Sequence, residues 1–298
     1  MQIFDEGGPQ LETPVNLVVP AQSTVSVLPG TYAQGLTSPM ILVSADGVGV
    51  VAWLQTSGLD GEVALGVGRA AGTAPSYTQV LPGVEGGQQS TLRIGNPGAD
   101  PATVEIQVMS RDGGAPLEGA VSVKVAPRST SQVSLDGLQP GDGAIALEAD
   151  QEIVAAITET HVGAEHPQVK DATYFTRTIV GSARQISEAN LMTAAQLGSM
   201  ADQLGFEGVT VALSVANTSD EAATLDIQGQ EKTLDAGSAQ TYTLLPEATR
   251  NRFVSDTPVH AAYVVCVTTP VGEVRSVAAL GVEGILAQTR SVVLEPRG

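Results

Sequence analysis

Three aspartates recur at nearly constant spacing and are the first candidates for chemistry. Asp46, Asp150 and Asp256 lie 104 and 106 residues apart, and each precedes a short segment rich in Val and Ala. Carboxylates from three segments could together bind a hard cation, because such ions prefer oxygen ligands. The alternative, which we favour, is that each aspartate accepts backbone N–H bonds in a tight turn between two strands.

Two acids and two histidines lie within eight residues of one another, at Glu159, His161, Glu165 and His166. Both residue types ligate metals, but their spacing matches neither a helix face nor a common zinc pattern. Residues 163–167 have the composition of a polar loop. We therefore expect a solvated loop here and no metal centre.

His260 and Cys266 share one strand-like segment and are the candidate nucleophile pair. Such a pair needs a base within reach of the thiol and a third group that orients the base, and neither residue has one at a diagnostic spacing. We expect both to be packing or strand-surface positions. Because Cys266 is the single cysteine, the chain forms neither an internal disulfide nor a thiolate cluster.

The glycine clusters do not predict a cofactor. Gly66-Val67-Gly68 and the paired glycines at 7–8, 86–87 and 113–114 fall between strand-like segments. A phosphate-binding loop needs a helix terminus behind it. The sequence therefore predicts no nucleotide and no other cofactor.

The elements that must position these residues follow a repeat of about 106 residues. The segment from Gly7 matches the segment from Gly113, so that Ser23 falls on Ser129, and a weaker third copy places Ser238 at the same position. Self-similarity at a fixed period indicates a repeat architecture. We expect one repeat-built domain over 1–298, with segments 1–88, 89–208 and 209–298.

A second landmark of the repeat is the turn sequence Asn96-Pro97-Gly98, which recurs in altered form at Asn217. Its third occurrence is missing. We therefore expect the chain to start and stop inside a repeat.

Within one repeat, apolar and polar residues alternate with a period of two, which is typical of half-buried strands. The fold class is therefore all-β, with about eight strands per repeat. Two architectures fit: a closed six-bladed propeller-like ring, which we favour, or tandem immunoglobulin-like β-sandwiches. The exception is a short helix near 187–205, where Leu197, Met200 and Leu204 follow helical spacing in an insertion.

A formal net charge of −18 argues against nucleic acid and anionic membrane surfaces as partners. No stretch approaches the roughly 20 apolar residues of a membrane helix, and the first residues lack the pattern of a secretory signal. We expect no membrane span in this segment, and a location that is either cytoplasmic or set by an export segment upstream.

The repeat pattern resembles a family of uncharacterised envelope proteins from actinobacteria, built of units of roughly 110 residues. The resemblance rests on Leu92, Ile94, Asn96-Pro97-Gly98, Ala102-Thr103-Val104, Asp112-Gly113, Val125-Ala126-Pro127-Arg128-Ser129-Thr130, Ala149-Asp150 and Ile153-Val154-Ala155-Ala156. It implies an extracytoplasmic protein, secreted or held by an upstream membrane anchor. It carries over no functional residue.

We therefore expect a non-catalytic scaffold or binding module of the bacterial cell envelope, with a protein or cell-wall glycan as partner. The rival is a carbohydrate-active enzyme with its site at the centre of a ring. Such an enzyme should break the equivalence of the repeats by placing unmatched acids, histidines or arginines at one mouth.

Overall fold

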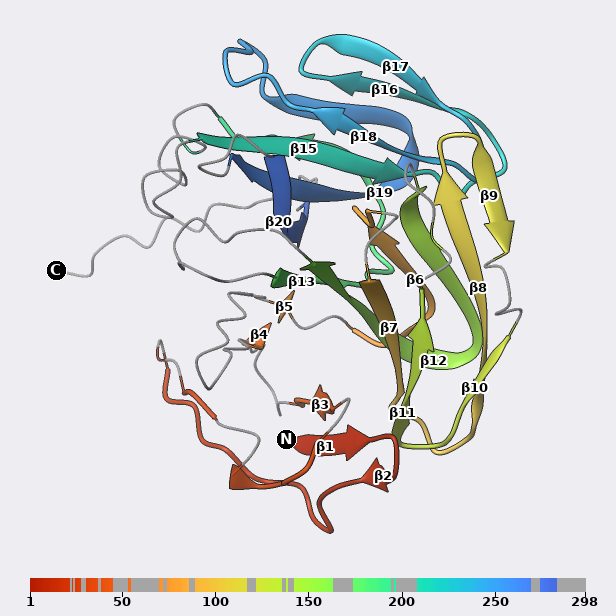
Figure 1. Cartoon of the computed structure of the whole chain (residues 1–298), viewed down its shortest axis with the longest axis vertical. Coiled ribbons are helices and arrows are strands. Elements are labelled where there is room, and N and C mark those ends of the chain that lie inside the picture. The colour runs from red at the N-terminus through yellow and green to blue at the C-terminus, as the bar shows by residue number, and fades with distance from the viewer. Residues whose placement is uncertain are drawn as a thin grey trace, which may run out of the picture.

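The computed structural model describes residues 1–21, 23, 25–27, 31–36, 39–44, 53–54, 70–71, 74–85, 89–116, 122–135, 138, 142–162, 174–193, 196, 208–268 and 274–282. Figure 1 shows β-strands almost throughout this part of the chain, which confirms the all-β prediction. The prediction of ring closure needs residues 283–298, which lie outside the described residues. It stays a prediction, as does the count of three repeats.

Three short strands near the amino terminus form the first sheet, in the order β2-β1-β3. They are β1 (Gln2–Asp5), β2 (Gly8–Pro9) and β3 (Met40–Leu42). A separate pair joins β4 (Trp53–Leu54) and β5 (Ala70–Ala71).

The middle sheet has eight strands, and one long strand organises it. The strands are β6 (Ser76–Pro82), β7 (Gln89–Asn96), β8 (Ala102–Ser110), β9 (Gly113–Pro116), β10 (Val123–Val125), β11 (Ser129–Ser134), β12 (Asp142–Val162) and β13 (Tyr174–Val180). The first half of β12 pairs with β6 and β8, and its second half pairs with β7 and β13. Because one strand belongs to two layers, the sheet curls around its own core.

Period-two alternation fills that core. In β7 the buried side chains include Leu92 and Ile94, and in β12 they include Ile145, Ile153 and Ile157. Successive side chains of a strand point to opposite faces, so every second apolar residue reaches the space between the layers.

The carboxyl-terminal sheet repeats this arrangement with seven strands. They are β14 (Ile186–Asn190), β15 (Gly208–Ala216), β16 (Ala223–Ile227), β17 (Gln230–Leu234), β18 (Ala239–Thr243), β19 (Arg252–Thr268) and β20 (Val274–Gly281). Here β19 takes the place of β12, since its first half pairs with β14 and β16 and its second half pairs with β15 and β20. Phe253, Leu213 and Leu225 lie in a second, separate core.

The predicted segment boundaries at 88/89 and 208/209 fall inside these two sheets. The strand β6 precedes the first boundary but pairs with β12, and β14 precedes the second but pairs with β19. Each sheet thus takes its first strand from the end of the preceding predicted segment.

The predicted helix near 187–205 is wrong at its start, because residues 186–190 form β14 along the edge of β19. Pairing with an available strand edge decides this segment, since its backbone N–H and C=O groups find partners there. Thr193 and Gln196 then form a capping box: Thr193 N donates to Gln196 Oε1 at 2.8 Å, and Gln196 N donates to Thr193 Oγ1 at 3.3 Å. Gln196 is helical, and the remainder of the prediction lies outside the described residues.

The described part of the chain contains no helix that is long and apolar enough to cross a membrane.

Candidate functional site

Two of the three recurrent aspartates each make the same cross-strand hydrogen bond. Asp150 Oδ1 accepts the Thr103 N–H at 2.7 Å, and Asp256 Oδ1 accepts the Thr224 N–H at 2.8 Å. Hydrogen bonds from Thr224, first its backbone N–H and then its side chain, hold the pKa of Asp256 below its usual value. Asp46 lies outside the described residues, and within those described no group of three or more His, Cys, Asp or Glu could hold a metal ion.

Asn217 and Asn96 are fully buried hydrogen-bond hubs at equivalent places in the two sheets. Asn96 Nδ2 donates to the carbonyls of Asp100, Val125 and Ala126 at 2.8–3.2 Å, and its Oδ1 accepts the Gly98 N–H.

Asn217 Nδ2 likewise donates to the carbonyls of Glu221, Leu234 and Asp235 at 2.8–3.3 Å. Its Oδ1 accepts the Ser219 N–H. The Asn-Pro-Gly landmark and its altered copy therefore tie one strand end to the turn of a neighbouring strand.

The serine landmarks share one hydrogen bond. The hydroxyls of Ser23, Ser129 and Ser238 each donate to the carbonyl three residues earlier, at 2.7, 2.8 and 2.7 Å. At Ser129 and Ser238 this bond closes a tight turn at the entry to β11 and β18.

The turn before Ser129 contains a strained residue. Arg128 has φ +50°, whereas the equivalent residue before Ser238 is Gly237, with φ +67°. A side chain in this left-handed region costs about 1–2 kcal/mol relative to the right-handed one, and glycine avoids that cost. Strain of this kind in a non-glycine residue points to a functional site, so the surroundings of Arg128 are of interest.

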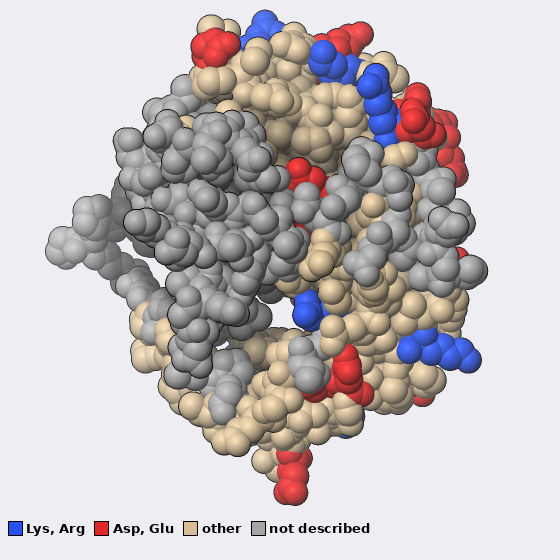
Figure 2. All heavy atoms as spheres, viewed as in Figure 1, with Lys and Arg blue, Asp and Glu red and all other residues tan. Residues whose placement is uncertain are grey.

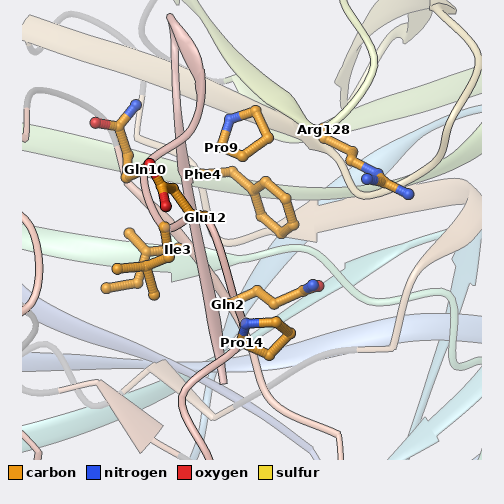
Figure 3. A pocket seen from close by; sticks show the side chains of 9 residues that line it. Gln2, Ile3, Phe4, Pro9, Gln10, Glu12, Pro14 and Arg128 are labelled. Carbon is orange, nitrogen blue, oxygen red and sulfur yellow. The ribbon is translucent and has the colours of Figure 1, made fainter.

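Arg128 lines a pocket of about 370 Å³ between the amino-terminal sheet and the middle sheet. Figure 3 shows Phe4 between Pro9 and Gln2, with Arg128 beside them. The lining residues are Gln2, Ile3, Phe4, Pro9, Gln10, Leu11, Glu12, Pro14 and Arg128.

The pocket combines a rigid apolar wall with polar groups. Ile3 and Phe4 are buried in β1, while Gln10, Glu12 and Arg128 are exposed. Gln10 is held in place because its backbone N–H donates to the Ile3 carbonyl at 2.8 Å and its side chain donates to the Gly8 carbonyl at 2.9 Å. One guanidinium, one carboxylate and two amides thus surround an apolar floor.

Sequence reasoning missed this pocket, because residues 2–14 and Arg128 are distant in the chain. One observation could have indicated it: the repeat aligns Arg128 with Gly237, so a charged residue stands where a copy has glycine. Unmatched charge at one mouth of a ring is the feature that we expected of the rival enzyme.

The expectation of a solvated loop around residue 159 is wrong for Glu159 and His161, which both belong to β12. The strand continues because β7 and β13 pair with it on its two sides. Glu159 is fully buried, and its Oε1 accepts the Glu85 N–H at 2.9 Å. Glu165 and His166 lie outside the described residues.

His260 and Cys266 do not lie within reach of each other. They are six residues apart on β19, or roughly 20 Å along an extended strand. His260 is buried, and its Nδ1 has no hydrogen-bond partner among the described atoms. Desolvation lowers the pKa of His260 to about 4, against a smaller opposing effect of the Arg184 backbone.

This burial predicts an acid-sensitive stability. Because the folded protein holds His260 neutral while the unfolded chain takes up a proton near pH 6.5, stability falls as the pH drops from about 6.5 toward 4. We expect His260 to account for about 2 kcal/mol of the unfolding free energy lost between pH 7 and pH 5. Denaturant melts at several pH values should show that His260→Val, which copies the equivalent Val154, removes this loss.

The described part of the chain is an all-β protein of curled antiparallel sheets, with a pocket between the amino-terminal and middle sheets. The chain belongs to the family described as "Family of unknown function (DUF5719)", whose model matches residues 1–198. The search of curated proteins gave no match.

Two solved structures show partial similarity. The structure titled "Crystal Structure of Thermotoga maritima 1070" is 19% identical, covers 37% of this chain and 95% of its own, and has a TM-score of 0.30. A GH2 beta-galacturonidase from Eisenbergiella tayi bound to galacturonate is 11% identical, with 78% and 43% covered and a TM-score of 0.16. At these TM-scores neither carries an argument about fold or activity.

Proposed function

We propose that this protein is a non-catalytic binding module of the bacterial cell envelope, located outside the cytoplasm, and that its pocket takes a carboxylate-bearing piece of cell-wall glycan. The observation that carries the proposal is Arg128, a strained arginine at a pocket where the equivalent turn has Gly237. Strain that a glycine would relieve is retained when the side chain does something else.

The chemistry of the pocket favours a small ligand of this class. A volume of about 370 Å³ lies at the lower end of ligand pockets, where one or two sugar rings fit. The Arg128 guanidinium can pair with a carboxylate, and the amides of Gln2 and Gln10 can bond hydroxyls. The exposed rings of Pro9 and Pro14 offer apolar contact for the C–H face of a sugar ring.

Charge distribution supports a local site rather than a broad electrostatic surface. Figure 2 shows acidic and basic side chains interspersed over the described part of the visible face. With a formal net charge of −18, attraction of a carboxylate depends on one arginine in the right place.

We also propose that the chain consists of three copies of one unit in tandem. The Ser23, Ser129 and Ser238 hydroxyl bonds support three copies. So does the register in β1, where Phe4 pairs with Met40 as Met109 pairs with Ala144 in the middle sheet.

The proposal predicts that Arg128→Gly separates binding from folding. Glycine suits the backbone at this turn, so the free energy of unfolding should stay unchanged or rise by up to about 1 kcal/mol. Binding of muramyl dipeptide, a carboxylate-bearing wall fragment, should be lost. Titration followed by NMR chemical shifts would measure binding, and thermal melts would measure stability.

Arg128→Lys is the matched control, since it keeps the charge and should retain part of the binding, and N-acetylglucosamine is the neutral control ligand. Saturable shifts of equal size in wild type and Arg128→Gly would remove Arg128 from the site. No shifts in wild type would remove the ligand class.

A further inference from the structure

The junction between the middle and carboxyl-terminal sheets is small and apolar. On the middle sheet it consists of Val80, Met109 and Ala144, which we call the junction face, and all three side chains are at most 1% exposed. They pack against Ala216 and Ala239 of the carboxyl-terminal sheet.

The backbones approach closely at this junction. An ideal Cβ on Gly143 would lie 3.4 Å from Ala239, and Ser214 Oγ donates to the Gly143 carbonyl at 3.3 Å. Larger or charged residues therefore have no room there.

The junction between the amino-terminal and middle sheets uses equivalent positions. Met40 takes the place of Ala144, since each lies six residues before its recurrent aspartate. Met40 contacts Gly95, and Gly95 precedes Asn96 as Ala216 precedes Asn217. A Cβ on Gly95 would overlap the Met40 sulfur. At the junction of the amino-terminal and middle sheets the long Met40 side chain therefore faces glycine, whereas at the junction of the middle and carboxyl-terminal sheets Ala144 faces Ala216.

The carboxyl-terminal sheet carries polar residues where a third junction face would lie. Arg250 lies six residues before Asp256 and so matches Ala144. The position of Met109 has no counterpart, because β16 ends at Ile227, which matches Ile106. Asn190 matches Val80: Val80 pairs with the residue two positions after Ala144, and Asn190 pairs with the residue two positions after Arg250. Both polar side chains, Asn190 and Arg250, are exposed.

A side-chain network closes the same end of the sheet. Gln228 Nε2 donates to the Leu245 carbonyl at 3.0 Å and to Asn251 Oδ1 at 3.3 Å, and Gln228 Oε1 accepts the Leu245 N–H at 2.7 Å. Two of these bonds satisfy the backbone N–H and C=O of Leu245. This end of the carboxyl-terminal sheet therefore presents polar groups to water.

We propose that the carboxyl-terminal sheet is a capping unit, whose exposed end at Asn190 and Arg250 stacks on neither a further unit nor a second copy of this chain. Arrays of stacked units need such polar ends to stay soluble, and covering an unpaired arginine is costly. The assembly is then an open tandem stack, because a closed ring of these units would have to cover this face.

Thiol labelling of the full chain tests the cap. In a Cys266→Ser background, Val80→Cys and Asn190→Cys place a thiol at matching positions of the two sheets, and Ala144→Cys and Arg250→Cys form a second pair. Each variant is treated with a maleimide at low and high protein concentration.

We expect the thiols at 190 and 250 to react as exposed thiols at both concentrations, and those at 80 and 144 to react at least roughly a hundredfold more slowly, because labelling there needs local opening. The Ala144→Cys pair decides the matter if Val80→Cys fails to fold. Protection of the thiol at 190 or 250 at either concentration would overturn the cap. Equal rates within the 144 and 250 pair would overturn the junction from which it is inferred.

Discussion

We expect Asn217→Ala to lower the free energy of unfolding by about 3–5 kcal/mol. The substitution removes the donor that serves the buried Leu234 carbonyl and the part-buried Glu221 and Asp235 carbonyls, and the acceptor that serves the Ser219 N–H. Each buried group left without a partner costs about 1–3 kcal/mol, while water can reach some of them and reduce the total. Denaturant unfolding followed by circular dichroism measures the loss.

Two further variants make this result specific. Asn217→Asp keeps the shape and the acceptor but removes the donor, so it should be destabilised as well. Thr218→Ala alters the next residue, whose hydroxyl only accepts from the exposed Gln185 side chain, and should cost less than about 1 kcal/mol. If Thr218→Ala cost as much as Asn217→Ala, the hub would not be the source of the effect.

Ala144→Arg, which places the cap residue inside the junction, should destabilise the protein by about 3 kcal/mol or more. Ala144 is fully buried against the alanines of the next sheet, so a guanidinium there has neither space nor a described partner. The reverse change, Arg250→Ala, lies at the matching exposed position and should stay within about 0.5 kcal/mol of wild type.

Ala144→Met provides a graded version of this test. The larger apolar side chain should cost about 1–3 kcal/mol by overpacking, less than arginine. A set of melts in which Arg250→Ala is the most destabilised variant would contradict the difference between a packed junction and an exposed end.

The sequence predicted the strands well because their information is local. Alternating residues such as Leu92, Ile94 and Ile106 need only the period of two to be assigned to the core. The length of β12 was not predictable in this way, because Ala149 and Asp150 have the composition of a turn. The strand extends to Val162 because it pairs with β8 up to Ala149 and with β7 and β13 beyond Ile153.

The repeat pattern in the sequence identified the landmark residues, but it did not predict their hydrogen-bond partners. Asn96 and Asn217 recur in sequence, yet their hydrogen bonds reach carbonyls 17 to 30 residues away. The pocket was missed for the same reason, since Phe4 and Arg128 meet only through the packing of β1 and β2 on β11. Position in the repeat, rather than spacing in the chain, identifies Arg128.

Co-sedimentation with purified, insoluble cell-wall glycan is the most direct test of a non-catalytic binding module centred on Arg128. Wild-type protein should sediment with the glycan and release no soluble reducing sugar, whereas folded Arg128→Gly should remain in the supernatant. Release of soluble fragments by wild type, or equal sedimentation of Arg128→Gly, would contradict the account.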